Sequence, residues 1–253
     1  MKKENEKFAG SNIMEGMVSI RAVLSSGNGR KIEEILFDNA KAESKMKEIS
    51  YLRHRGEELG FSVRGVDASE IDRLCIGNSH GGIIAVCSER PLPELTENDI
   101  SGDFWVMLEG IEDPYNFGYC MRSLYAAGAS GIIVPPRNWM SAAGVVCRAS
   151  AGASELFRIF VADSAAAAKL FHGKGFAVIA ADKTKDAVSI YDADIKRPLL
   201  LIVGGEKRGI THAALAECDS VVCLDYGRDF PAALSAASAA SIIAFEIFRR
   251  GRK

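Results

Sequence analysis

The sequence predicts an α/β protein in two parts, a small N-terminal α/β unit and a larger C-terminal unit built on a mostly parallel sheet. Strand-like and helix-like segments alternate through the second part, which is the order of a parallel sheet covered by helices on both faces. Residues 89–99 (ERPLPELTEND) contain two prolines, several charges and no apolar periodicity, as exposed connections do. We therefore expect a flexible tail at residues 1–12, a first domain at 13–88, a linker at 89–99 and a second domain at 100–253.

Composition indicates an ordinary globular protein. The 253 residues are 48% hydrophobic, which is enough for real cores, and the N-terminus MKKENEKFAGSN has no apolar region of a secretory signal behind its charges. The six cysteines form no CxxC pair and lie near no histidine at metal-ligand spacing, which favours reduced thiols and excludes a predicted metal site. These features predict a cytoplasmic protein without a membrane anchor. The net charge of −2 does not by itself indicate nucleic-acid binding.

Local patterns define the elements of the first domain. Ile20, Val23 and Leu24 have helical spacing before the breaker SSGNG, and Gly60 ends a charged amphipathic segment. Asp67 can cap a short helix. The expected elements are a helix through 20–24, strands at 34–37, 61–66 and 82–87, a helix at 43–59 and a short helix ending at 74.

In the second domain, short apolar runs bounded by glycine, proline or polar residues predict buried strands. The expected strands are at 104–108, 131–134, 176–181, 199–203 and 221–224. The expected helices are at 116–127, 143–149, 165–171, 211–218 and 234–249. Serines and Glu246 interrupt the last of these, so a buried helix fits this segment better than a membrane span.

Three segments of the second domain combine special backbone residues with polar ones after a predicted strand. The first, LEGIEDPYNFGYCMR at residues 108–122, has a turn at Asp113-Pro114, a potential cap in Asn116 and a guanidinium in Arg122. Such a crevice at the end of a strand suits an active site. A capped helix with an ordinary surface arginine explains the segment equally well.

The second segment, IVGGEKRGIT at residues 202–211, is a glycine-rich turn close to the phosphate-binding GxxxxGK[ST] loop. Ile210 replaces the lysine that this loop requires, and Glu206 would direct a carboxylate at phosphates, so we exclude it. The third segment, residues 222–235, on its own predicts only a strand, a loop and the start of a buried helix.

Taken in order, the three segments resemble the motifs of the SpoU (TrmH-like) RNA methyltransferases, LDGVxDPxNxGxxxR, LVxGxExxGL and IPM…SLNVSxAxxxxxYE. Between them, RASAGA at residues 148–153 is similar to the family's KxSxGA. The first domain resembles the small ribosomal-protein-like RNA-binding domain of the family's two-domain members, including SHGGI at 79–83 near the family's HQG. The resemblance spans roughly residues 14–249.

This resemblance implies a trefoil-knotted, SPOUT-type C-terminal domain, a homodimer through that domain, and S-adenosylmethionine-dependent 2′-O-methylation of a ribose in RNA. The added first domain favours ribosomal RNA over tRNA as the partner. Carried over by position, the catalytic residues would be Arg122, Asn116, Glu206 and Ser235. The residues lining the cofactor pocket would be Gly204, Gly205, Leu224 and Leu234. Because arginine keeps its proton, Arg122 would stabilise charge on the hydroxyl rather than act as a simple general base.

The third motif departs from the family, since Ser235 stands where the family has asparagine and Ala233 and Ala237 replace two serines. A weakened relative that binds RNA or assists ribosome assembly therefore remains an alternative. A metabolic α/β enzyme that binds a nucleotide is a second alternative, and the near-match glycine loop is its only support.

Overall fold

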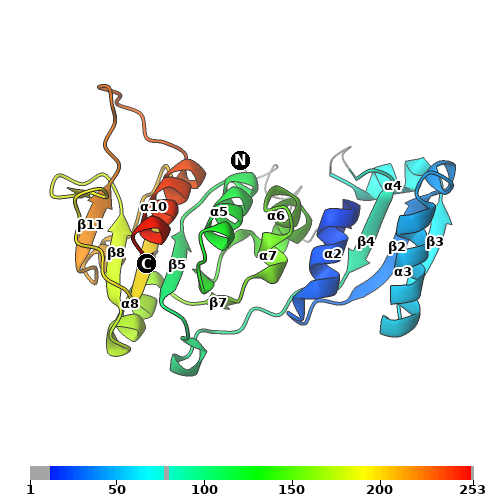
Figure 1. Ribbon diagram of the computed structural model, residues 1–253, viewed down its shortest axis with the longest axis horizontal. Coiled ribbons are helices and arrows are strands. Elements are labelled where there is room, and N and C mark those ends of the chain that lie inside the picture. The colour runs from blue at the N-terminus through cyan, green and yellow to red at the C-terminus, as the bar shows by residue number, and fades with distance from the viewer. Residues whose placement is uncertain (1–11, 77–79, 252–253) are drawn as a thin grey trace. The chain divides into compact units, whose positions relative to one another are not determined.

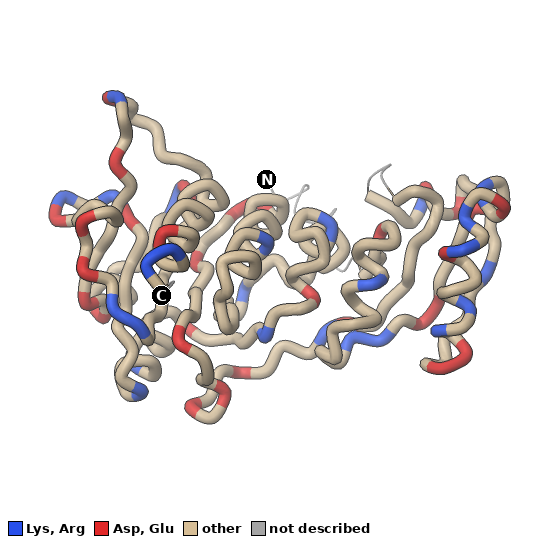
Figure 2. Tube along the Cα trace, in the orientation of Figure 1, with Lys and Arg blue, Asp and Glu red and all other residues tan. Residues whose placement is uncertain are grey.

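The structure is a computed structural model that describes residues 12–76 and 80–251, so nearly all of the expected tail at 1–12 and the start of the SHGGI turn lie outside the described residues. The chain forms two compact units (Figure 1). The N-terminal unit comprises the chain up to Pro91 together with Trp139–Leu156, and the C-terminal unit comprises Leu92–Asn138 and Phe157–Lys253. Lys and Arg are interspersed with Asp and Glu in each unit (Figure 2).

The N-terminal unit has a four-stranded mixed sheet in the order β1-β4-β2-β3. Strand β4 is antiparallel to both of its neighbours, whereas β2 and β3 are parallel. The elements in the first stretch of chain are β1 (Ile13–Glu15), α2 (Gly16–Ser26), β2 (Ile32–Asp38), η1 (Asn39–Lys41), α3 (Met46–Leu59), β3 (Ser62–Val66), α4 (Ala68–Leu74) and β4 (Ile83–Cys87).

Glycines end the two longer helices of this unit as the sequence predicts. Gly27 after α2 and Gly60 after α3 have φ of 59° and 82°, in the left-handed region where glycine has no side-chain clash. The expected helix at 43–59 begins later, at Met46, because the single turn η1 precedes it. The sequence missed β1, which has only three residues.

Helices α6 (Ala143–Ala149) and α7 (Ala153–Leu156) pack into the N-terminal unit, although the sequence places them within the expected second domain. Ala143 and Cys147 lie in the same apolar cluster as Ile20 of α2 and Ile35 of β2. Burial raises the pKa of the Cys147 thiol to about 12. Alternation of elements along the chain does not reveal this packing, because it depends on contacts between distant segments.

The C-terminal unit has a seven-stranded sheet in the order β7-β6-β5-β10-β8-β11-β9, and all of its pairs are parallel. The predicted parallel sheet is confirmed. Its strands are β5 (Phe104–Glu109), β6 (Gly131–Val134), β7 (Ile159–Val161), β8 (Ala177–Ala181), β9 (Val188–Ser189), β10 (Leu199–Gly204) and β11 (Ser220–Cys223). Its helices and helical turns are η2 (Glu97–Asp99), α5 (Pro114–Ala126), α8 (Ser164–Gly173), α9 (His212–Leu215) and α10 (Ala236–Gly251). The helical turn η3 (Trp139–Ala142) belongs to the other unit. The sequence missed β7 and β9, which are three and two residues long.

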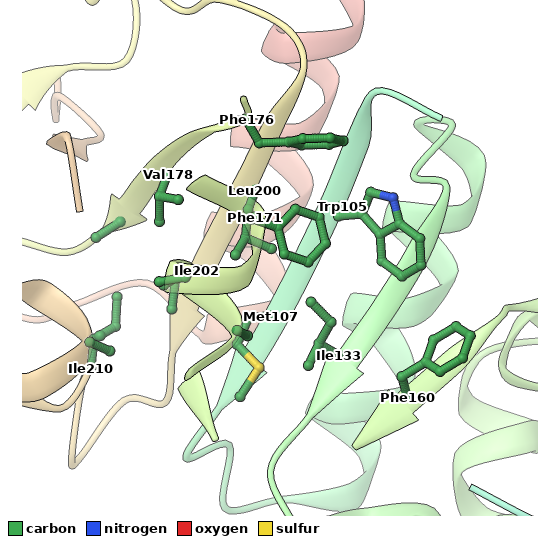
Figure 3. Close-up of a cluster of buried hydrophobic side chains, with 14 residues drawn as sticks. Trp105, Met107, Ile133, Phe160, Phe171, Phe176, Val178, Leu200, Ile202 and Ile210 are labelled. Atoms are coloured by element: carbon green, nitrogen blue, oxygen red, sulfur yellow. The ribbon is translucent and has the colours of Figure 1, made fainter. Parts of the chain in front are cut away.

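One face of this sheet is covered by α8 and α9. Alternate residues of β5, including Trp105, point into a buried cluster with Phe171 of α8 (Figure 3). The ring centroids of Trp105 and Phe171 are 5.6 Å apart, and those of Phe171 and Phe176 are 5.0 Å apart, both in edge-on geometry. Such pairs fix the face of the sheet on which α8 lies.

Helices α5 and α10 lie side by side and pack against each other. The hydroxyls of Ser241 in α10 and Ser123 in α5 are hydrogen-bonded at 2.6 Å. At the end of α10, Glu246 accepts from Arg249 and Arg250, which lower the pKa of its carboxyl to about 2. Arg250 also donates to carbonyl oxygens of residues 190, 191 and 193, so this cation holds the end of the helix in place. Among the described helices, none combines the length and apolarity that crossing a membrane requires.

Candidate functional site

The carboxyl ends of β5 and β10 meet at the centre of the sheet, where Gly204 pairs with Glu109. A Cβ atom on Gly205 would lie 2.0 Å from the carbonyl oxygen of Gly110, and one on Gly204 would lie 2.6 Å from the carbonyl carbon of Gly209. Both glycines are therefore required by the close approach of the protein's own backbone. A side chain at Gly204 would distort this turn before it met a ligand.

Glu206 joins three segments at this edge of the sheet. Its Oε1 accepts a hydrogen bond from Asn116 Nδ2 at 3.0 Å and another from the backbone N–H of Ala236 at 2.9 Å. Asn116 is held in turn because Asp113, the cap of α5, accepts from its backbone N–H at 2.7 Å. One carboxylate thus connects the first turn of α5, the glycine turn and the start of α10.

Arg122 lies on α5, six residues beyond Asn116, which corresponds to about 9 Å along the helix axis. Its side chain is exposed, and it has no hydrogen bond or ion pair with any residue that the structure describes. A cation in this state is available to a ligand. Nothing in the fold requires its charge.

Ser235 immediately precedes α10, and its hydroxyl accepts from the backbone N–H of Ser238 at 3.1 Å. The Ser235 and Ser238 hydroxyls are also 3.0 Å apart. This is the geometry of a helix N-cap. Within the described part of the chain, Ser235 makes no hydrogen bond to Arg122.

The loop after β11 borders a solvent-open cavity of about 540 Å³. Its lining residues are Asp225, Tyr226, Gly227, Arg228, Asp229, Phe230 and Leu234. Of the four expected cofactor residues, Leu234 lines this cavity, whereas Gly204, Gly205 and Leu224 do not. The backbone N–H of Leu234 donates to the Tyr226 hydroxyl at 3.1 Å, which closes the loop on itself.

Sequence reasoning singled out no aromatic residue in this loop. The pair Tyr226 and Phe230, four residues apart, was the available signal, since two aromatic residues in a polar loop are candidates for a binding surface. Their ring centroids are 6.3 Å apart, and Lys183 Nζ lies 5.1 Å from the centroid of the Tyr226 ring.

The chemistry of this lining fits S-adenosylmethionine, which carries an aromatic base and a sulfonium cation. Tyr226, Phe230 and Leu234 offer apolar surface for the base, and the carboxylates of Asp225 and Asp229 offer negative charge. A Cβ atom on Gly227 would meet nothing within 4 Å, so a ligand can approach the backbone there. Among the described residues, no group of three or more His, Cys, Asp or Glu is placed to hold a metal ion.

A parallel sheet, a glycine turn at its central strand ends and a cavity in the adjoining loop define an α/β enzyme domain that binds its ligand at the carboxyl edge. Comparison of the sequence with protein families agrees with this class. The model of the SpoU rRNA Methylase family matches residues 103–245, and the model described as RNA 2′-O ribose methyltransferase substrate binding matches residues 13–93. The chain belongs to the SpoU rRNA methylase family.

Similar proteins span nearly the whole chain. The 23S rRNA (guanosine-2′-O-)-methyltransferase RlmB of Shewanella oneidensis is 28% identical over 249 residues, which cover 95% of this chain and 98% of that protein. The putative TrmH family tRNA/rRNA methyltransferase YacO of Bacillus subtilis is 27% identical over 201 residues, covering 77% of this chain and 80% of that protein.

Solved structures share the fold. The rRNA methyltransferase from Sinorhizobium meliloti has a TM-score of 0.77 and 22% identity, covering 100% of this chain and 92% of that one. The SpoU methyltransferase AviRb from Streptomyces viridochromogenes, in complex with AdoMet, has a TM-score of 0.74 and 21% identity, covering 94% and 89%. These likenesses confirm the predicted SpoU-type α/β fold.

The cap at Ser235 leads to a prediction. Ser235→Ala is expected to lower the free energy of unfolding by about 1 kcal/mol, because the N–H of Ser238 loses its acceptor, whereas Ser235→Asn keeps a good cap and stays near wild type. Urea unfolding of the two variants measures this. An alanine variant as stable as wild type would contradict the capping role. Single-turnover methyl transfer by the same two variants tests the separate expectation that Ser235 is a catalytic residue.

Proposed function

We propose that this protein transfers the methyl group of S-adenosylmethionine to a ribose 2′-hydroxyl of ribosomal RNA. The observation that carries the proposal is the Glu206 junction. Glu206 accepts one hydrogen bond from Asn116 and one from the backbone N–H of Ala236, which follows the loop that forms the cavity. The chain that carries this junction belongs to the SpoU family. The names of the relatives support ribosomal RNA as the substrate, with a guanosine as the methylated nucleoside.

In this proposal each site residue has a distinct role. S-adenosylmethionine, bound in the loop cavity at Leu234, supplies the methyl group on its sulfonium. Methyl transfer is an in-line displacement, so the protein contributes mainly by positioning the hydroxyl and by stabilising its developing negative charge. Arg122 is the proposed catalytic cation, and Asn116 orients the acceptor while Glu206 holds Asn116. Gly204 and Gly205 allow the close backbone turn that carries Glu206, and Leu224 directly precedes the loop of the cavity.

The function is tested with unmodified 23S rRNA made by transcription and S-adenosylmethionine carrying a labelled methyl group. We expect label at one ribose, located by primer extension at low nucleotide concentration. Transcribed tRNA serves as the competing substrate. Labelling of tRNA alone would replace ribosomal RNA as the substrate. Binding of RNA without any transfer would favour the alternative of a weakened relative that acts as an RNA-binding or assembly factor.

The N-terminal unit is the proposed RNA-binding module, and residues 89–99 the proposed linker to the methyltransferase domain at 100–253. The match of residues 13–93 to a substrate-binding family model supports this assignment. An enzyme with this substrate would act in the cytoplasm, where ribosomal RNA is found in a bacterial cell.

A homodimer through the C-terminal domain is also proposed. Ile242, Phe245 and Phe248 are exposed at three-residue spacing on α10, and Tyr119 and Tyr125 are exposed on the adjacent α5. An apolar surface of this kind fits a second copy of the same surface, as in two-fold symmetric dimers. The proposed trefoil knot involves the same helix, because the chain after β11 returns to the glycine turn at Ala236.

Phe245→Glu is expected to shift the protein from dimer to monomer, because a charge would be buried in the interface. Sedimentation velocity measures this shift. Val188→Glu, at an exposed apolar residue of β9 that belongs to neither helix, is the matched control and should leave the mass unchanged. If the wild-type protein is a monomer at every concentration, the dimer proposal is wrong.

A further inference from the structure

The proposed catalytic site uses neither the histidine turn before β4 nor the RASAGA segment, yet the structure brings the two together. Both line a second cavity of about 390 Å³, which lies wholly within the N-terminal unit. The first turn of α2 and the start of α3 form its other walls, through Val18 and Lys45 among others. This cavity joins a segment matched by the methylase family model to one matched by the substrate-binding model.

The RASAGA wall is rigid. It ends α6 in a Schellman motif, in which the N–H of Gly152 donates to the carbonyl of Cys147 at 2.8 Å and the N–H of Ala151 donates to that of Arg148 at 3.1 Å. Ala151 therefore has a φ of 51°, in the left-handed region. A Cβ atom on Gly152 would lie 2.6 Å from the Cβ of Ala22, so only glycine lets α2 pack here. The turn places Ala151 and Arg148 at the cavity.

The polar groups of the cavity are also fixed. Arg148 Nη1 donates to Glu15 Oε2 at 2.5 Å, and the other oxygen of Glu15 accepts from the backbone N–H of Ile76 at 3.1 Å. Lys45 Nζ lies 3.2 Å from Glu48 Oε1. His80 accepts from the backbone N–H of Gly82 through Nδ1 at 3.1 Å, which directs its Nε2 toward a carboxylate of α4.

The walls thus present fixed donors and fixed acceptors beside apolar surface from Met17, Val18 and Ile83. The charges of Arg148 and Lys45 are balanced by those of Glu15 and Glu48, so the cavity has little net positive charge to attract a bare phosphate. A nucleobase is a better match, because its flat apolar faces are edged by both donors and acceptors. Unpaired RNA bases are recognised through contacts to their faces and hydrogen bonds along the base edge. In this cavity the apolar contact is aliphatic, and the fixed polar groups face the base edge.

We propose that this cavity binds one unpaired nucleotide of the RNA substrate, with its base against Val18 and its edge toward Arg148 and Lys45. The volume of the cavity lies within the range of small-ligand sites. The inference rests on the proposed function for the identity of the substrate as RNA. It goes further by giving the RASAGA segment a role in recognition, since Arg148 comes from within the residues that match the methylase model.

Val18→Glu tests the cavity in the full-length protein. Val18 is 62% exposed and lies in the first turn of α2, which contains no acidic residue, so a carboxylate there suits the helix terminus and leaves the fold intact. In the cavity the same charge would repel RNA. We expect at least a tenfold weaker affinity for unmodified 23S rRNA transcript at one fixed salt concentration. The unfolding temperature and the calorimetric affinity for S-adenosylmethionine should not change.

Leu59→Glu is the matched control, because it adds the same charge at an exposed apolar residue of α3 outside the cavity. Its RNA affinity should stay within twofold of wild type. Equal affinities for the Val18 and Leu59 variants would overturn the proposal. Loss of RNA binding by Val18→Glu would support the cavity even if the wild-type protein methylated no RNA, in which case the proposed function alone would fail.

Crosslinking gives a second, independent test. With 4-thiouridine-substituted 23S rRNA transcript and the wild-type protein, we expect crosslinked peptides from the first turn of α2 and from the turn at His80. Crosslinks confined to other parts of the chain would overturn the assignment. The Val18→Glu variant should lose these crosslinks and the Leu59→Glu variant should keep them.

Discussion

Arg122→Ala is expected to lower the single-turnover rate of methyl transfer by about 10² to 10³-fold, the usual loss when one group that stabilises developing charge is removed. The fold should be unaffected, because the exposed Arg122 side chain has no partner among the described residues. Affinity for S-adenosylmethionine should stay within a few-fold, since the role is realised in the transition state. Rapid-quench measurement of methyl transfer and calorimetry separate the two quantities.

Two further variants sharpen this test. Arg122→Lys should not restore the rate, because a point charge lacks the planar fork of a guanidinium. Lys169→Ala removes an exposed cation from α8, on the opposite face of the sheet, and should transfer methyl groups at the wild-type rate. Wild-type turnover by Arg122→Ala would refute the catalytic role.

Glu155→Ala is expected to destabilise the N-terminal unit by about 3 to 5 kcal/mol, the cost of leaving a buried charge without its partner. The side chains of Arg30 and Glu155 are 1% and 0% exposed, and Arg30 Nε donates to Glu155 Oε2 at 3.0 Å. Asn28 Nδ2 donates to the same oxygen at 2.8 Å. The pair connects the loop before β2 to α7.

Urea unfolding, monitored by hydrogen exchange at the backbone amides of β4, measures the stability of the N-terminal unit separately from that of the C-terminal unit. Asp194→Ala is the control, because it breaks an ion pair whose side chains are both largely exposed and should change stability by less than about 1 kcal/mol. The double variant Arg30→Met/Glu155→Leu should regain most of the loss, since apolar side chains of similar size need no partner. A Glu155→Ala protein as stable as wild type would contradict the role of the pair.

The same contacts bear on how the chain divides into domains. A fragment that starts at residue 96 would keep α6 but lose α2 and β2, against which Ala143 and Cys147 are buried. It would therefore expose apolar surface that the full chain covers. The linker at 89–99 remains the proposed boundary in sequence, but separate folding of the fragment does not follow from it.

Much of the C-terminal sheet could be predicted because its strands are short apolar runs with clear ends. The strand at 131–134 and the helix at 143–149 were predicted with the bounds that the structure has. The helix expected at 211–218 is shorter, ending at Leu215, because it forms only one turn before the chain enters β11. Boundaries of such short elements depend on contacts that periodicity does not contain.

Site residues could be predicted only where a motif carried them. The sequence placed Asn116 and Glu206 in the same site, and the structure joins them by a hydrogen bond, but their chemical roles remain proposals. Gly204 was expected to line the cofactor pocket, whereas its tight contact is with Gly209. A motif identifies the residues that a family shares, but it does not identify the contact that makes each of them necessary.

The sequence by itself determined the family, the parallel α/β sheet and the residues worth testing, because motif order, strand hydrophobicity and turn chemistry are local properties. Only the tertiary structure decided that the hydroxyl of Ser235 caps α10, that Tyr226 closes the cavity loop, and that RASAGA packs against the N-terminal fold. Each of these depends on a distance between groups that the chain brings together only when folded. Spacing along the sequence does not specify such distances.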